Sequence, residues 1–147
     1  EEEVYLKQFQ ELDPQDAEDI EKVIKGSGQT IRKRPYADTW VKYLKSKGYH
    51  VYILSNYSSY MLDHTKKELT FRREMDGEVF SCYANQLKPD AEIYQTILNK
   101  YQLKPEECVF IDDRPENCRG AQEQGIHTIC FKDFKQVTAD LEKLGVK

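Results

Sequence analysis

The sequence has 147 residues, a length that fits one folded domain with its own hydrophobic core. Its 22 Lys and Arg residues are dispersed and are outnumbered by 26 Asp and Glu, and this net charge of −4 argues against a nucleic-acid-binding surface. No apolar run is long enough for a membrane-spanning helix, and the acidic beginning Glu1-Glu2-Glu3 does not resemble a signal peptide. We therefore expect a cytoplasmic protein with neither a nucleic-acid nor a membrane partner.

The four cysteines, at positions 82, 108, 118 and 130, show no Cys-x-x-Cys spacing. Isolated cysteines of this kind are typical of reduced thiols in a cytosolic protein, and they argue against both a disulfide framework and a zinc site. The three histidines, at positions 50, 64 and 127, are scattered along the chain, so we assign none of them a ligand role.

Residues 1–33 predict a small helical appendage. Apolar residues such as Leu6 and Ile20 recur at helical spacing. Asp13-Pro14 and Gly26-Ser27-Gly28 interrupt that spacing and divide the segment into short helices. The remaining residues, 34–147, form the predicted core.

The core begins with a helix-to-strand unit. Pro35 opens a helix that Gly48 closes, at the position where a left-handed residue normally ends a helix. The apolar run Val51-Tyr52-Ile53-Leu54 then predicts a buried strand. Its end delivers two polar residues, Ser55 and Asn56.

A long helix, a short strand and a second helix are predicted next. The spacing between Ser58 and about Met75 is helical, and residues 77–82 are typical of a short strand. Apolar residues spaced i, i+3, i+4, i+7 from Tyr94 to Tyr101 give the clearest helical pattern in the chain. Lys88 lies just before that helix, where backbone N–H groups and the positive end of the helix dipole favour an anion.

Two adjacent carboxylates follow the next predicted strand. Cys108-Val109-Phe110-Ile111 is a short apolar run, Asp112 and Asp113 come directly after it, and Pro115 suits the first turn of a helix. Adjacent aspartates repel each other, so a fold that seats both at the end of a strand usually supplies a cation or many donors. We interpret the pair as a Mg²⁺ site. The alternative is that Asp113 only caps the following helix while Asp112 faces water.

The alternation of strands and helices predicts an α/β domain with a doubly wound parallel sheet. In such a sheet the carboxyl ends of neighbouring strands share one crevice, which brings Ser55, Lys88 and Asp113 together. A hydroxyl, an ammonium and a carboxylate in that crevice fit a phosphoryl group with its metal ion. The alternative for each residue is structural: Ser55 only turns the chain, and Lys88 is one solvated lysine among many.

Three segments in this order resemble the motifs of the haloacid dehalogenase-like (HAD) hydrolases, in their phosphatase branch with a small helical cap. The similarity runs from about Arg34 to Phe131. The segments similar to motifs II, III and IV are, in that order, Ile53-Leu54-Ser55-Asn56, Leu87-Lys88-Pro89-Asp90 and Phe110-Ile111-Asp112-Asp113-Arg114-Pro115-Glu116-Asn117.

The resemblance implies a role for each matching residue. Ser55 would bind the phosphoryl oxygens with Asn56 beside it, and Lys88 would stabilise negative charge on the phosphoryl group and on the nucleophile. Asp113 would be the Mg²⁺ ligand and Asp112 a second ligand or a partner of the first. Asn117 would orient the loop. The branch suggests sugar phosphates and similar small phosphomonoesters as substrates, and residues 1–33 would be part of the cap.

The sequence departs from the family pattern in one respect. HAD phosphatases begin with an apolar strand that ends in Asp-x-Asp, whose first aspartate attacks phosphorus and whose second acts as acid and base. Among these residues, Asp13, Asp16 and Asp19 lie in a polar, helix-like stretch without such a strand. We therefore expect the nucleophile to lie outside these residues, which should be inactive alone. The alternative is a non-catalytic protein that binds phosphate or a partner, or an inert fragment.

Two other protein classes use similar residues. A receiver domain phosphorylated on aspartate also carries an acidic pair after a strand, but it needs roughly a hundred residues behind that pair. Only 34 residues follow Asp113. A dehalogenase of the same family is the second class, and the metal-type acidic pair favours phosphate chemistry over it.

Overall fold

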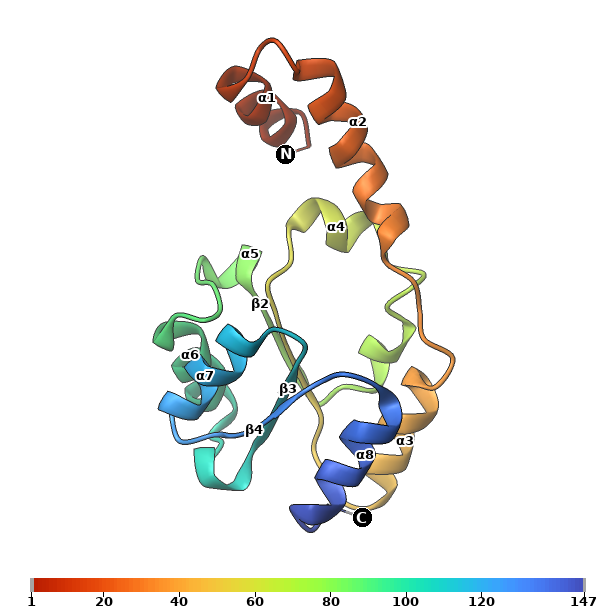
Figure 1. Ribbon diagram of the computed structural model, residues 1–147, viewed down its shortest axis with the longest axis vertical. Coiled ribbons are helices and arrows are strands. Elements are labelled where there is room, and N and C mark those ends of the chain that lie inside the picture. Colours follow the sequence, from red (N-terminus) through yellow and green to blue (C-terminus); the bar gives the residue numbers. More distant parts are fainter. Residues whose placement is uncertain (1, 147) are drawn as a thin grey trace.

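The computed structural model describes residues 2–146, without the side chains of residues 2–5 and 9. The described chain alternates helices and strands (Figure 1). The α-helices are α1 (Glu2–Leu12), α2 (Ala17–Ser27), α3 (Ala37–Ser46), α4 (Ser59–His64), α5 (Ser81–Ala84), α6 (Ala91–Tyr101), α7 (Pro115–Glu123) and α8 (Phe134–Lys143). The strands are β1 (Tyr52–Ser55), β2 (Gly77–Phe80), β3 (Val109–Asp112) and β4 (His127–Cys130), and three short 3₁₀ helices are η1 (Gly28–Thr30), η2 (Thr70–Glu74) and η3 (Pro105–Glu107).

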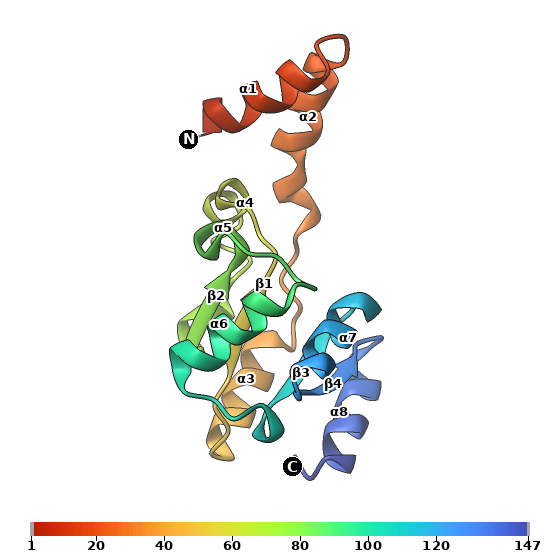
Figure 2. The ribbon, with the colours of Figure 1, turned by 90° about the vertical axis from the view of Figure 1, so that its left-hand side faces the viewer.

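Helices cover both faces of the strands. In Figures 1 and 2, α6 and α7 lie on one face and α3 and α8 on the other. The first face is closed by a core of Val79, Ile93, Tyr94, Ile97, Ala121 and Ile126. The second is closed by Ile129, Val137 and Leu141, against which Trp40 and Ile111 pack. This arrangement confirms the predicted α/β class with helices on both sides of parallel strands.

The strands form two parallel pairs rather than one continuous sheet. β1 pairs with β2 from Tyr52 opposite Gly77 to Ser55 opposite Phe80. β3 pairs with β4 in the same way, and its last residue, Asp112, lies opposite Cys130. Within residues 2–146, no backbone ladder joins β1 to β3. The predicted doubly wound sheet is therefore present as two halves.

The burial of the strands follows this division. Val79 and Phe80 of β2 and Ile129 of β4 are buried, whereas every residue of β1 and of β3 is only partly buried. Strands inside a parallel sheet are normally buried on both faces and paired on both edges. β1 and β3 therefore have the sequence of inner strands but the burial of edge strands.

The first two helices form a hairpin that projects from the core (Figures 1 and 2). They meet the core where Ser27 Oγ lies 3.0 Å from Met61 Sδ and where Gly28 packs against His64. Leu12 and Val23 of this hairpin are 81% and 70% exposed. The division of the chain at residue 33 into a partial cap and a core stays a prediction.

The single helix expected between residues 58 and 75 was wrong. The structure has the short helix α4, which ends at His64, and the separate 3₁₀ helix η2. Thr65 is buried, and its hydroxyl lies 2.6 Å from Met61 O and 2.8 Å from Tyr57 Oη. Tertiary contacts that bury this residue outweigh the local helical spacing.

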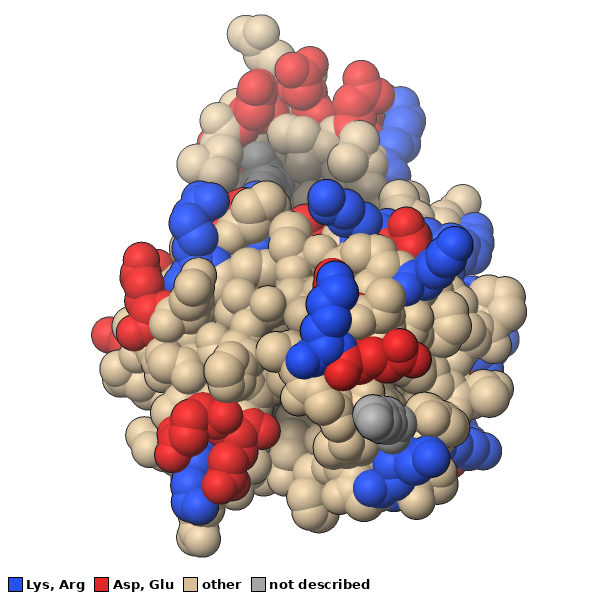
Figure 3. Space-filling model, turned by 60° about the horizontal axis from the view of Figure 1, so that its bottom comes forward, with Lys and Arg blue, Asp and Glu red and all other residues tan. Residues whose placement is uncertain are grey.

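The charged residues lie mostly on the surface, where basic and acidic side chains are interspersed on the face shown in Figure 3. Exposed pairs such as Lys104–Glu107 and Lys143–Asp140, both at 2.7–2.9 Å, add little to stability because water screens them. None of the helices within residues 2–146 is long and apolar enough to cross a membrane.

Helix α7 touches the segment that carries Lys88 through Gly120. A Cβ atom at Gly120 would lie 2.4 Å from the carbonyl oxygen of Pro89 and 3.1 Å from the Tyr94 ring. The backbone of the Lys88–Pro89 segment therefore rests directly on α7, and only glycine leaves room for it.

We expect Gly120→Ala to lower the free energy of unfolding by about 1–3 kcal/mol, because the added methyl group forces the two backbones apart. The control is Gly26→Ala in α2, where nothing lies within 4 Å of the added Cβ and the higher helix propensity of alanine should leave stability unchanged or slightly raised. Urea unfolding of both variants measures the difference. Equal stabilities would contradict the close packing.

Candidate active site

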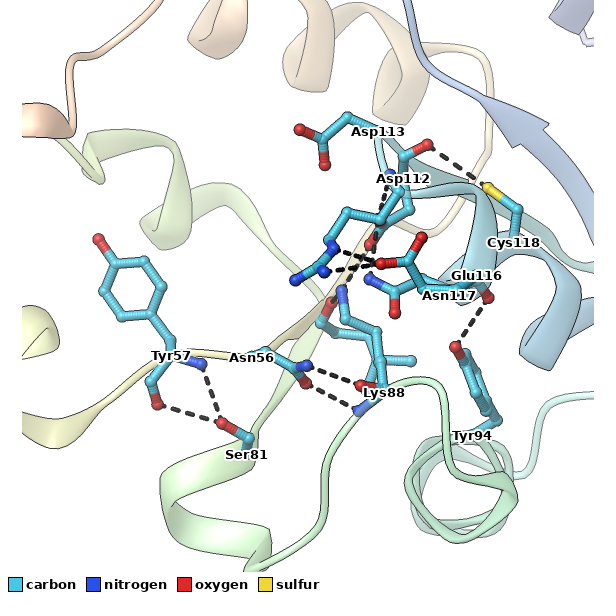
Figure 4. Close-up of polar contacts among 12 residues, drawn as sticks. Asn56, Tyr57, Ser81, Lys88, Tyr94, Asp112, Asp113, Glu116, Asn117 and Cys118 are labelled. Atoms are coloured by element: carbon cyan, nitrogen blue, oxygen red, sulfur yellow. Dashed lines mark hydrogen bonds and ion pairs between the residues drawn. The ribbon is translucent and has the colours of Figure 1, made fainter.

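Three segments bring polar side chains together at the carboxyl ends of β1 and β3 (Figure 4). Ser55 and Asn56 come at the end of β1, Asp112 and Asp113 at the end of β3, and Lys88 from the loop before α6. These are the residues that the sequence singled out, and the structure places all of them in one region. The topology explains the convergence, because both strand pairs are parallel and present their carboxyl ends to the same side.

Lys88 joins the two strand pairs. Its ammonium donates to the backbone oxygen of Leu54 at 2.8 Å and to Asp112 Oδ2 at 2.6 Å. The side chains of Lys88 and Asp112 are only 7% and 8% exposed, and the ammonium lies 5.2 Å from the centre of the Phe110 ring. The alternative of a solvated lysine is therefore wrong for Lys88.

Asp112 is held as an ionised carboxylate. Its Oδ1 accepts hydrogen bonds from the Arg114 backbone N–H at 2.9 Å and from Asn117 Nδ2 at 3.0 Å. Burial by itself would raise the pKa of Asp112, but the hydrogen bonds from Lys88, Arg114 and Asn117 hold it below its ordinary value. Both oxygens of Asp112 are thus engaged by protein donors, and the carboxylate serves as the counter-ion of Lys88.

Asn117 connects this ion pair to the core. Its side chain is buried, and its backbone oxygen accepts a hydrogen bond from the Tyr94 hydroxyl at 2.8 Å. Tyr94 is completely buried, and burial raises its pKa far above the ordinary value, so the hydroxyl stays a neutral donor. Residues of α6 and α7 therefore fix the orientation of the Asp112 carboxylate, which supports the orienting role expected of Asn117.

Ser55 and Asp113 are the groups left open at the site. Among the described residues, neither the Ser55 hydroxyl nor the Asp113 carboxylate has a hydrogen bond or ion pair to another side chain or backbone group. Asp113 is exposed, and Figure 4 shows its carboxylate pointing away from Lys88. The N-cap of α7 is Arg114, so the alternative that Asp113 only caps this helix is wrong. Both groups are free to meet a ligand.

The oxygen donors at this site meet part of what a magnesium ion needs. Mg²⁺ in phosphate-handling sites is usually held by one or two carboxylates together with water and substrate oxygens. Asp113 supplies one such carboxylate, whereas the oxygens of Asp112 already face protein donors. No group of three His, Cys, Asp or Glu side chains suited to a metal occurs among residues 2–146. The residues present thus fit part of a Mg²⁺ site, with Asp113 as its better ligand.

Asn56 holds the Lys88 loop. Its side-chain amide accepts a hydrogen bond from the Lys88 backbone N–H and donates one to the Lys88 backbone oxygen, both at 2.9 Å. Figure 4 shows the two bonds side by side. The amide that was expected to bind substrate is therefore engaged with the protein at two of its positions.

Sequence analysis missed Ser81, which follows the last residue of β2. Its buried hydroxyl accepts a hydrogen bond from the Tyr57 backbone N–H at 2.9 Å and donates to the Tyr57 backbone oxygen at 3.3 Å. This contact fixes the chain just beyond Asn56. The signal was present, because Ser81 stands at the carboxyl end of a strand as Ser55 does.

Known proteins similar to this chain agree with the resemblance found in its sequence motifs. The family model described as haloacid dehalogenase-like hydrolase matches residues 2–125. Flavin mononucleotide hydrolase 1, a chloroplast protein of Arabidopsis thaliana, is 39% identical over 66 residues, which cover 45% of this chain and 27% of the relative. Glyceraldehyde 3-phosphate phosphatase of Pyrococcus furiosus is 28% identical over 117 residues, which cover 76% of this chain and 47% of the relative.

A similar solved structure carries both a metal and a phosphate. It is a HAD family enzyme of Bacteroides thetaiotaomicron, in a variant form complexed with magnesium and inorganic phosphate. It matches this chain with a TM-score of 0.69 and 26% sequence identity, over 80% of this chain and 65% of that one. The chain thus spans about a quarter of the length of the flavin mononucleotide hydrolase and about half that of the glyceraldehyde 3-phosphate phosphatase.

The adjacent aspartates should differ sharply in their effect on stability. We expect Asp112→Asn to lower the free energy of unfolding by about 3–5 kcal/mol, because it leaves the Lys88 ammonium buried without a counter-charge. Asp113→Asn should change it by less than about 0.5 kcal/mol, because this carboxylate is exposed and has no partner among residues 2–146. Urea unfolding at pH 7 measures both variants.

The stability difference between the wild type and Asp112→Asn should also depend on pH. Because the pKa of Asp112 is lowered by folding, its stabilising effect is present above the unfolded pKa of about 4 and is lost as pH falls through the folded value. The difference should therefore be constant from pH 7 to about 5 and shrink below about 4. A difference that grows on acidification would contradict the ion pair.

Proposed function

Because the chain belongs to the haloacid dehalogenase-like hydrolase family, we propose that it forms most of the core of a Mg²⁺-dependent phosphohydrolase. Its substrate would be a small phosphomonoester such as a sugar phosphate. The observation that carries the proposal is that the Lys88 ammonium bonds to Leu54 O and to Asp112, the residues that directly precede Ser55 and Asp113 at the ends of β1 and β3. The Ser55 hydroxyl and the Asp113 carboxylate have no partner among the described residues and are open to a ligand.

The hydrogen-bonding capacity of the site supports a phosphoryl ligand. An ammonium has three N–H donors, and Lys88 uses two of them on Leu54 and Asp112, which leaves one for a substrate oxygen. The free Ser55 hydroxyl would donate to a second phosphoryl oxygen. Both donors would act on negative charge that shifts during phosphoryl transfer, which is where fixed donors contribute most to the rate.

Asp113 would hold the metal ion. When bound, Mg²⁺ would offset the negative charge of the phosphoryl oxygens. The Asp113 carboxylate is exposed and has no partner among the described residues, so its side chain can turn toward such an ion without breaking a contact. Asp112 would keep Lys88 charged and oriented and would not itself bind the metal.

The nucleophile would come from a strand outside residues 1–147. We place this strand between β1 and β3, where both strands have unpaired edges and partly exposed apolar residues. The first aspartate of an Asp-x-Asp pair at its end would attack phosphorus and form a new oxygen–phosphorus bond while the ester oxygen–phosphorus bond breaks. The second aspartate would protonate the leaving oxygen to give the substrate alcohol and would then take a proton from the attacking water. Water would then cleave the aspartyl-phosphate and return the carboxylate together with inorganic phosphate.

The relatives support phosphate chemistry and a small substrate. The flavin mononucleotide hydrolase and the glyceraldehyde 3-phosphate phosphatase both carry a phosphorylated metabolite in their names. Neither name fixes the substrate of this chain, because the match covers less than half of each relative. The cytoplasmic location and the absence of nucleic-acid and membrane partners stay predictions.

Phosphate or partner binding without turnover is the second candidate function. It is favoured by the limited donor set, since Asp113 is not joined by two further metal-ligating side chains within residues 2–146. A binding protein would retain inorganic phosphate and Mg²⁺ but would not hydrolyse an ester. Turnover by the full-length protein separates the two candidates.

We expect the full-length protein to hydrolyse p-nitrophenyl phosphate with Mg²⁺ and to lose this activity on chelation with EDTA. Asp113→Asn should lower turnover by about 100-fold or more, because it removes a charged ligand of the metal while leaving the fold intact. Asp13→Asn, which changes another exposed aspartate, is the matched control and should be fully active. Wild-type turnover in Asp113→Asn would refute the metal assignment.

Residues 1–147 alone should show no turnover, since they lack the attacking aspartate. The intact mass of the purified full-length protein should accordingly exceed 17.3 kDa by at least a strand and its loop. Steady-state assays of this segment and of the full-length protein, at equal concentration, test the difference. Full activity of residues 1–147 alone would contradict the proposed position of the nucleophile.

A further inference from the structure

The side chain of Asn56 hydrogen-bonds the backbone of the loop that carries Lys88, as a neighbouring strand would. A carboxamide has the same donor and acceptor as a peptide group, and Asn56 presents both to the backbone N–H and oxygen of one residue, Lys88. The backbone partners also fix which end of the amide is oxygen and which is nitrogen. The pair of 2.9 Å bonds therefore defines both the position and the orientation of the Lys88 backbone relative to the end of β1.

Lys88 is held at its other end as well. Its ammonium lies on Leu54 O, which is two residues before Asn56 in the same strand end, and on the Asp112 carboxylate. Both the backbone and the ammonium of Lys88 are thus held against the end of β1. The next residue, Pro89, packs with its carbonyl oxygen against Gly120 of α7. With the backbone and two ammonium hydrogens fixed, the direction of the third N–H is fixed too.

Asn56 is exposed, so its two hydrogen bonds compete with water and contribute little to global stability. Their effect is instead local, because they hold a loop that otherwise has few backbone bonds of its own. Ser81 acts beside them by fixing Tyr57, and this prevents the end of β1 from moving with the loop. The end of β1 is therefore a rigid frame to which Asn56 attaches Lys88.

We propose that Asn56 is a positioning residue for Lys88 and not a ligand of the substrate. This inference deepens the proposed function and rests on it. If Asn56 is lost, the Lys88 loop moves relative to the strand ends and the ammonium no longer points at the phosphoryl oxygen. A displacement of this kind lowers the rate of the chemical step and leaves ground-state binding nearly unchanged.

The test uses Asn56→Ala and Asn56→Asp in the full-length protein, with Asn99→Ala as the matched control. Asn99 is an exposed asparagine of α6 whose side chain has no partner in the described structure. Asn56→Ala removes both bonds, whereas Asn56→Asp keeps an acceptor for the Lys88 N–H and loses the donor to the Lys88 oxygen. Hydrogen exchange of the Lys88 amide and steady-state kinetics with p-nitrophenyl phosphate are measured for each.

In Asn56→Ala we expect the Lys88 amide to exchange at least about 10-fold faster, while the amides of β3 keep their protection. The kcat should fall by about 10–100-fold with little change in KM, and Asn56→Asp should recover part of both effects. Asn99→Ala should match the wild type.

Unchanged exchange at Lys88 would overturn the proposal whatever the activity. A rise in KM with kcat preserved would also overturn it, because the remaining N–H of the Asn56 amide would then be binding the substrate. A wild-type protein without turnover would contradict the proposed function alone. The exchange of the Lys88 amide would still decide whether Asn56 holds the loop.

Discussion

A buried ion pair between Lys88 and Asp112 links the two halves of the sheet at the end where the polar residues gather. The halves share no backbone ladder within residues 2–146, so their relative position depends on side chains and on the helices that span them. Tyr94 of α6 contributes to this by packing edge-on against Phe110 of β3, with ring centres 5.6 Å apart. A buried ion pair adds little net stability, because desolvation offsets most of its attraction, but it restricts which arrangements are possible. Here it places the ends of β1 and β3 at a fixed separation.

The ion pair between Lys88 and Asp112 also gives the two adjacent aspartates different roles. Repulsion between two neighbouring carboxylates is avoided because one of them, Asp112, is turned inward and neutralised, while Asp113 is turned outward into water. The inward carboxylate accepts hydrogen bonds from three donors, one each from Lys88, Arg114 and Asn117. Tyr94 of α6 in turn donates to the backbone oxygen of Asn117 in α7, so these two helices fix the orientation of the carboxylate. The outward carboxylate keeps its charge for a ligand. Local geometry thus gives two identical side chains different roles.

Much of this could be predicted from the sequence, because the short apolar runs at 51–54 and 108–111 are unambiguous and the polar residues follow them directly. Parallel topology then predicts that Ser55 and Asp113 lie at the same edge of the strands, whereas Lys88 reaches this edge from the loop before α6. What could not be predicted depends on tertiary contacts. The helix expected up to Met75 stops at His64, and the next residue, Thr65, is buried and bonds to the Tyr57 hydroxyl. The bonds from Asn56 to Lys88 join residues that are 32 positions apart. The split of the sheet could not be predicted either, because it depends on β1 and β3 not pairing with each other, which only the three-dimensional arrangement shows.

The most direct test of the account is a crystal structure of the full-length protein with Mg²⁺ and inorganic phosphate. The account predicts a further parallel strand between β1 and β3, a magnesium ion on the Asp113 carboxylate, and phosphate oxygens within hydrogen-bonding distance of Ser55 Oγ and Lys88 Nζ. Direct pairing of β1 with β3 would contradict the proposed place of the nucleophile. Phosphate and metal bound away from these three side chains would contradict the site itself.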